Sequence, residues 1–194
     1  MAKLSVICER LSTHTRDPGA IARGPAAAVA AILREREDAP SSELLFIRRA
    51  EHPSDPWSGH VAFPGGRRDP EDESLLATAI RETREEVGVE LSAGDLLARL
   101  PDVQAMARSG AQNLIVTPFV FSVGRDVALR PNVEVADTLW VPMEALARGD
   151  GRSSFSLEFR GQRYELPCIH LEPGQHRLWG MTFRMLETLL EALA

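Results

Sequence analysis

Residues 73–87 constrain the fold of this chain most, because their apolar side chains recur at helical spacing. A step of about 100° per residue places four of them on one arc of a helix: Leu76, Ile80, Thr83 and Val87. Gly88 follows directly, and glycine readily takes the left-handed conformation in which many helices end. The segment therefore predicts an amphipathic helix that packs by one face against the rest of the protein.

Another face of this predicted helix carries three carboxylates. With Glu82 as origin, Glu85 falls about 60° to one side and Glu86 about 40° to the other. Like charges at this spacing repel each other unless positive charge lies between them. A divalent cation would relieve the repulsion, and Mg²⁺ prefers carboxylate, carbonyl and water oxygens. The alternative is a solvated acidic face that Arg81 and Arg84 partly neutralise, and the isolated motif leaves both interpretations open.

Short apolar runs between turn signals predict strands on both sides of the helix. Before it they lie at residues 26–33, 44–47 and 61–63, the first two forming a hairpin. After it they lie at 96–100, 114–123 and 138–141, followed by a hairpin of 155–159 with 164–169. Pro118 favours an edge or a bulge in its strand. Further helices are predicted at 143–147 and 178–193. This order predicts an α/β fold, with a mixed sheet packed between helices as an α/β/α sandwich.

The chain is expected to form one domain with a short extension. Residues 1–24 show no clean periodicity, and Asp17-Pro18-Gly19 is a turn signal, so this segment is interpreted as an extension folded against a domain of residues 25–194. A chain of 194 residues is long enough to bury one sizeable core.

Charge and hydropathy exclude several classes of function. The net charge of −6 argues against non-specific nucleic-acid binding, which needs a basic surface. Charged residues or prolines interrupt every apolar stretch before the roughly 18 residues of a membrane span, so no membrane partner is expected. The first ten residues lack a signal-peptide pattern, which favours a cytoplasmic location. Cys8 and Cys168 have no partner at zinc-ligand spacing.

The segment 65–89 resembles the Nudix box, whose family pattern is Gx5Ex7REUxEExGU, where U is apolar. From Glu73 onward the spacing matches, with seven residues before Arg81. There are two departures. Six residues rather than five separate Gly66 from Glu73, and Thr83 stands where the pattern prefers an aliphatic residue. The extra residue falls in an Asp-Pro turn, where an insertion costs little.

The resemblance implies an enzyme that binds a divalent metal and hydrolyses a nucleoside diphosphate linked to another group. Carried over by position, Glu82, Glu85, Glu86 and the Gly66 carbonyl would hold Mg²⁺, with Mn²⁺ as an alternative ion. Arg81 would pair with Glu73 or Glu85 and orient the ligands. The general base varies within the family, and Glu134 is an outside candidate for it and a further candidate metal ligand. The expected partner is a small nucleotide diphosphate. A homodimer is one assembly that would accommodate these features, although the sequence does not fix the oligomeric state.

Flanking residues are similar to the coenzyme A pyrophosphatase branch of that family. The similarity lies in residues 44–50, Gly59, residues 63–66, 116–119 and 132–135, and 178–182. That branch usually has an arginine a few residues before Gly59, where this chain has Ser54-Asp55-Pro56-Trp57. ADP-ribose or another nucleotide diphosphate is the second substrate class, and an inactive nucleotide-binding module is the alternative of another kind. Six residues are candidates for substrate binding: Arg48, Arg49, Arg67, Arg68, Trp57 and His60.

Overall fold

Strand β1 (Ala26–Glu35) is the centre of the main sheet in the computed structural model, which describes residues 3–19, 24–36, 41–52, 58–105, 114–159, 161–171 and 176–194. It pairs antiparallel with β2 (Ser42–Arg49) and β4 (Gly65–Arg67), and parallel with β7 (Leu114–Ser122). The strand order is β3-β2-β1-β7-β5, with β3 (Val61–Ala62) and β5 (Leu96–Arg99) at its ends. In addition, β6 (Val103–Ala105) pairs with β7, and β8 (Val135–Pro142) pairs with β2. The predicted mixed sheet and the hairpin of β1 with β2 are confirmed.

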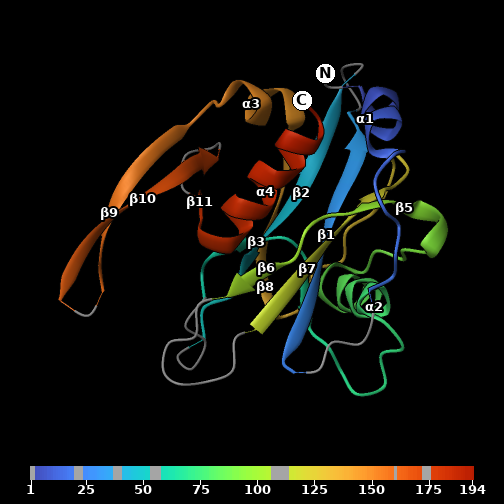
Figure 1. Ribbon diagram of the computed structural model, residues 1–194, viewed down its shortest axis with the longest axis horizontal. Coiled ribbons are helices and arrows are strands. Elements are labelled where there is room, and N and C mark those ends of the chain that lie inside the picture. Colours follow the sequence, from blue (N-terminus) through green and yellow to red (C-terminus); the bar gives the residue numbers. More distant parts are fainter. Residues whose placement is uncertain are drawn as a thin grey trace.

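Alternation along β1 divides the core into two layers. Ala28, Ala30 and Ile32 pack with the buried face of α2 (Leu75–Val87) on one side of the sheet. Val29, Ala31 and Leu33 pack on the other side with α1 (Leu4–Leu11) and α4 (Gly180–Ala192). Figure 1 shows α2 and α4 apart, with strands of the main sheet between them. The predicted α/β/α sandwich is confirmed.

Helix α2 begins two residues later than predicted. Ser74 takes the cap position, and its hydroxyl accepts a hydrogen bond from the Ala77 N–H at 3.1 Å, so Glu73 lies outside the helix. At the other end Gly88 has φ 69°, in the left-handed region, which confirms the predicted stop. Thr83 and Val87 are fully buried, as the apolar arc predicts.

Pro118 lies in an inner strand, so of its two predicted settings the edge is wrong, whereas the irregular pairing beside it fits the bulge. β7 runs between β1 on one side and the successive short strands β5 and β6 on the other. The Leu100 N–H donates to the Pro118 carbonyl at 2.9 Å, just where β5 has ended and β6 has not begun. The ladder is interrupted there, so the missing N–H of proline leaves no strand partner unsatisfied.

The C-terminal third forms a second sheet, of order β11-β10-β9. After α3 (Met143–Arg148), β9 (Arg152–Phe159) and β10 (Gln162–Leu171) form the predicted hairpin, which extends away from the main sheet in Figure 1. The last helix was predicted to start at residue 178. Instead Leu178 and Trp179 belong to β11 (His176–Trp179), because they pair with Ile169 and Cys168, and α4 starts at Gly180.

The N-terminal segment contains α1, which the sequence analysis did not predict. Ile7 and Leu11 of α1 are buried in the core layer that also contains α4. Further along, the Arg99 N–H donates to the Thr15 carbonyl at 2.7 Å. The segment thus contributes to the core, while the domain boundary near residue 24 stays a prediction. None of the helices in the described ranges is long and apolar enough to cross a membrane.

Two buried threonines of α2 give a matched test of the core. Both are fully buried, but the Thr78 hydroxyl donates to Asp72 at 2.9 Å, whereas the Thr83 hydroxyl has no hydrogen-bond partner among the described residues. We expect Thr83→Val to raise the free energy of unfolding by about 1 kcal/mol, because it removes an unsatisfied polar group at constant shape. Thr78→Val should lower it by about as much. Urea unfolding measures both, and a loss of stability in Thr83→Val would contradict the expectation.

Candidate active site

Glu86 is the buried carboxylate of the predicted acidic face. Its side chain is only 3% exposed, and it accepts a hydrogen bond from the Gly65 N–H at 2.8 Å. The Arg49 guanidinium lies 3.7 Å from its other oxygen. Burial raises the pKa of Glu86 to about 7, although the Gly65 hydrogen bond and the Arg49 charge act in the opposite direction. The carboxyl group is therefore held in place yet poorly compensated in charge.

Glu82 lies directly against the backbone of Gly66. A Cβ atom at position 66 would come within 2.5 Å of the Glu82 Cδ, so a larger residue there would displace this carboxylate. Burial raises the pKa of Glu82, while a hydrogen bond from Arg81 lowers it in part. The two glycines of the β3–β4 corner thus each contact one carboxylate of α2.

Arg81 binds three carboxylates, two of which share one of its nitrogens. Its Nε and Nη2 donate to the two oxygens of Asp72 at 3.0 and 2.9 Å. Its Nη1 donates to Glu82 at 2.8 Å and to Glu85 at 3.3 Å. The hydrogen bonds from Arg81 lower the pKa of Asp72 to about 2, against the opposing effect of burial. This arrangement fixes the direction of Glu82 and ties α2 to the turn that precedes it.

Arg81 pairs with Glu85, one of its two predicted partners, and with Asp72 in place of the other, Glu73. The pairing with Glu85 is present, but Glu73 is exposed and forms no ion pair with Arg81 in the described part of the chain. Five residues separate Gly66 from Asp72, so counting forward from the glycine, rather than back from Arg81, identifies the aspartate. The inserted residue shifts the register between the two ends of the motif.

Glu134 approaches the same site from the loop before β8. The Ala50 N–H donates to the Glu134 carbonyl at 2.7 Å, and the Asn132 N–H donates to the Glu86 carbonyl at 2.9 Å, so this loop lies against the end of α2. The Glu134 side chain is exposed, and its charge raises the pKa of both Glu82 and Glu86. Its predicted role as a base or metal ligand therefore has a location consistent with it.

The predicted substrate-binding arginines divide between several environments. Arg49 faces Glu86, whereas Arg68 donates to the Asp72 carbonyl at 3.1 Å and supports the turn. The Arg67 carbonyl accepts from Arg81 at 3.1 Å, while its side chain is exposed. Strand alternation places Arg48 on the opposite face of β2 from Arg49.

His60 lies directly before β3, the strand at one end of the main sheet. The His60 ring contacts Trp179 of β11, with ring centroids 4.9 Å apart. Trp179 itself is half-buried. Trp57 lies outside the described residues.

The site thus gathers Glu82, Glu85 and Glu86 on α2 with Arg49, Gly66 and Glu134 from other elements.

Metal binding has the right chemistry here, though not a closed cage. Within the described ranges no three acidic, histidine or cysteine side chains converge to enclose an ion. The reason is visible in the contacts, since Arg81 lies between Glu82 and Glu85 and Glu86 points to Gly65. The pKa values of Glu82 and Glu86 are raised, so nearby positive charge does not fully offset the cost of burying their ionised forms. Mg²⁺ commonly takes only one or two protein carboxylates and completes its shell with water and phosphate oxygens, which suits this donor set.

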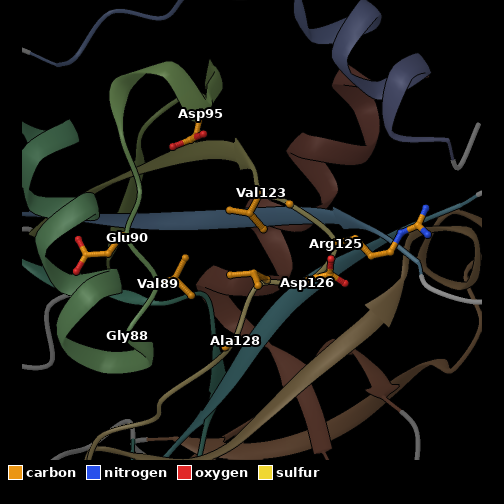
Figure 2. Close-up of a pocket in the computed structure, with 10 residues that line it drawn as sticks. Gly88, Val89, Glu90, Asp95, Val123, Arg125, Asp126 and Ala128 are labelled. Atoms are coloured by element: carbon orange, nitrogen blue, oxygen red, sulfur yellow. The ribbon is translucent and has the colours of Figure 1, made fainter.

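A separate pocket of about 430 Å³ lies beyond the end of α2, between residues 88–95 and the loop 123–128. Figure 2 shows Glu90 and Asp95 on one side of it and Arg125 and Asp126 on the other. Its charged groups already have partners in part, since Arg125 pairs with Glu35 at 3.2 Å and Asp95 caps the turn at Ser92. None of the predicted site residues lines this pocket.

Comparison with known proteins agrees with this arrangement. A family profile described as the NUDIX domain matches residues 23–158. An uncharacterized Nudix hydrolase, NudL, from Yersinia pestis (strain Pestoides F) is 30% identical over 198 residues, covering 96% of this chain and 87% of that protein.

Two solved structures show the same fold. A MutT/nudix family protein from Enterococcus faecalis superposes with a TM-score of 0.60 at 18% identity, covering 87% of this chain and 62% of that one. The NUDIX domain of Shewanella oneidensis NrtR, crystallised with ADP ribose, superposes with a TM-score of 0.59 at 19% identity, covering 96% and 97%.

The neighbouring acids Asp72 and Glu73 can be separated by isosteric substitution. Asp72→Asn removes the charge that holds Arg81 and should lower kcat/KM roughly tenfold to a hundredfold, the value of about 1.5–3 kcal/mol for a charge-assisted contact. Glu73→Gln should have a much smaller effect, because Glu73 is exposed and lies outside the helix. Steady-state kinetics on one diphosphate substrate measures both. A larger loss in Glu73→Gln would return the role to Glu73.

The buried Glu86 predicts a pH-dependent stability in metal-free protein. Its folded pKa of about 7 exceeds the ordinary 4.5, so the folded state holds its proton more tightly and stability falls as pH rises between these values. The loss attributable to this group is about 3 kcal/mol. Glu86→Gln keeps an acceptor for Gly65 and should remove most of that fall, with a remainder from Glu82, whose pKa burial also raises. The exposed Glu90→Gln should follow the wild type. Urea unfolding from pH 4 to 8 with chelator measures this, and parallel curves for all three proteins would contradict it.

Proposed function

We propose, because the chain belongs to the Nudix hydrolase family, that it hydrolyses the diphosphate of coenzyme A to adenosine 3′,5′-bisphosphate and 4′-phosphopantetheine. The single observation that supports hydrolysis is the fit between α2 and the β3–β4 corner. Glu86 binds the Gly65 N–H and Glu82 lies on Gly66, so the carboxylates have fixed positions before any ligand binds. Nudix hydrolases generally use divalent metal ions, and Mg²⁺ is the ion we propose here.

The protein's own groups account for orientation and proton transfer. The hydrogen bonds from Arg81 fix the orientation of the Glu82 and Glu85 side chains. The hydrogen bonds from Arg81 to Asp72 fix the guanidinium itself. When bound, a divalent ion supplies positive charge to the diphosphate and makes the attacking water more acidic. Positive charge nearby also lowers the pKa of Glu86 below its metal-free value of about 7 and favours the carboxylate form. Glu82, Glu86 and Glu134 remain the three candidates for the group that accepts the proton of the water.

Coenzyme A is supported by the flanking residues rather than by the acidic face. The similarity to the coenzyme A branch includes segment 44–50, which supplies Arg48 and Arg49, and segment 178–182, which supplies Trp179. ADP-ribose is the second candidate, since the NUDIX domain of S. oneidensis NrtR has the same fold and was crystallised with that compound. At 19% identity this likeness concerns the fold, so we place coenzyme A first.

A substrate panel with three matched variants tests the proposal. Coenzyme A, dephospho-coenzyme A and ADP-ribose are each incubated with Mg²⁺, and phosphomonoester products are quantified. Wild type should cleave coenzyme A most efficiently. Glu85→Gln and Glu86→Gln should lower turnover by orders of magnitude, while Glu90→Gln, an exposed glutamate just past the helix, should retain it. Better cleavage of ADP-ribose would select the second candidate. Absence of product from every compound would leave a nucleotide-binding module.

A further inference from the structure

Arg48 is a half-buried cation that the hydrolytic machinery does not use. Its Nε atom is buried and has no hydrogen-bond partner. In the part of the chain that the structure describes, its guanidinium forms no ion pair either. Arg68 shares a buried Nε without a partner, but its Nη2 donates to the Asp72 carbonyl. Arg49 faces Glu86, and Arg67 is exposed. A partly desolvated cation without a partner is costly, so Arg48 is suited to an anionic ligand.

The acid nearest to Arg48 in the sheet is already engaged. Asp137 of β8 is the direct cross-strand neighbour of Arg48. One Asp137 oxygen accepts the Thr138 N–H at 2.8 Å, and the other lies 3.5 Å from Nε2 of His176. His176 is itself buried, and its Nδ1 has no hydrogen-bond partner among the described residues. Asp137 is therefore already in contact with Thr138 and His176, and it forms no ion pair with Arg48 in the described part of the chain.

Arg48 also lies close to the hydrolytic site. It precedes Arg49, which reaches Glu86, and it pairs directly with Val61 of the short edge strand β3. The two arginines point to opposite faces of β2. Strand β3 has only two residues and lies at the end of the strand order, so Arg48 lies beside an edge of the main sheet.

The surface at that edge also suits a nucleotide base. Trp179 is half-buried between His60, at a centroid distance of 4.9 Å, and Phe155, at 5.2 Å. Both contacts are edge-to-face, which leaves ring area for stacking. An adenosine that carries a second phosphate would therefore meet an aromatic surface and a cation at one edge of the sheet.

We infer that Arg48 binds the 3′-phosphate of the adenosine part of the substrate and so determines specificity for coenzyme A over dephospho-coenzyme A. This inference rests on the proposed function for its substrate, and it selects one of the four arginines that the sequence left open. It requires no metal ion, so it can be measured on a product without turnover.

Binding of adenosine 3′,5′-bisphosphate and adenosine 5′-monophosphate, measured by titration calorimetry, tests it. Wild type should bind the bisphosphate roughly tenfold to a hundredfold more tightly, as expected for one charge-assisted phosphate contact. Arg48→Gln should bring that ratio close to one, and Arg48→Lys should restore part of it. Arg67→Gln and Arg163→Gln should keep the wild-type ratio, the second because Arg163 is exposed on the β9–β10 hairpin. Thermal midpoints verify folding, and Arg48→Lys serves as the test if Arg48→Gln does not fold.

The outcomes separate this inference from the proposed function. A wild-type ratio near one, or a ratio lost in Arg67→Gln but kept in Arg48→Gln, overturns the role of Arg48 even if coenzyme A is cleaved. A preference for the bisphosphate that depends on Arg48, in a protein that cleaves no diphosphate, supports the subsite and refutes the proposed hydrolysis. The same variants assayed on coenzyme A and dephospho-coenzyme A should show the change in ratio in kcat/KM.

Discussion

The hydrogen bond from the Gly65 N–H to Glu86 is the contact on which the site depends. It joins the last turn of α2 to the corner between β3 and β4 and satisfies a carboxylate that is otherwise buried. Gly65 can approach this closely because it has φ 146°, and a side chain there would overlap the Ala28 carbonyl of β1. The corner is thus pressed between the central strand and the acidic helix. The same placement brings the Glu82 carboxylate against the backbone of Gly66, where it accepts a hydrogen bond from Arg81.

The charge balance around this contact explains why the site is prepared for a cation. Arg81 and Arg49 are the basic side chains that face the acids, while Asp72, Glu82, Glu85, Glu86 and Glu134 supply negative charge. Asp72 and Arg81 largely compensate each other, so the remaining carboxylates share too little positive charge. Folding supplies the energy that holds them together, chiefly through the buried apolar face of α2. Binding of a divalent ion would then release strain that packing has imposed.

Sequence reasoning succeeded where local rules govern and failed where tertiary contacts decide. The apolar arc of residues 76–87 and the stop at Gly88 follow from helix geometry alone, and both are present. Asp72 was missed because spacing was counted from Arg81, whereas the turn from Asp69 to Asp72 determines which acid reaches the guanidinium. The predicted start of α4 was wrong because Leu178 and Trp179 extend the apolar pattern of the helix in sequence, but in the structure they pair with β10. Helix α1 has too few periodic residues to be identified without its core contacts. Whether an arginine is free or engaged likewise depends on distant residues, which is why Arg48 and Arg49 could not be told apart.

The alanines of β1 have a consequence for how this protein can change. Ala28 and Ala30 separate the central strand from α2 by single methyl groups, while the same strand carries the Gly65–Arg67 pairing on its edge. Strand β1 therefore sets both the distance of α2 from the sheet and the position of Gly65 and Gly66, which the carboxylates of α2 contact. A larger side chain at either alanine would push α2 away from β1, and so move the carboxylates of α2 away from the backbone of Gly65 and Gly66. Substitutions at Ala28 or Ala30 would therefore change the distance between the carboxylates of α2 and the two glycines. The activity could in this way change during evolution through apolar core residues, while every polar residue of the site is retained.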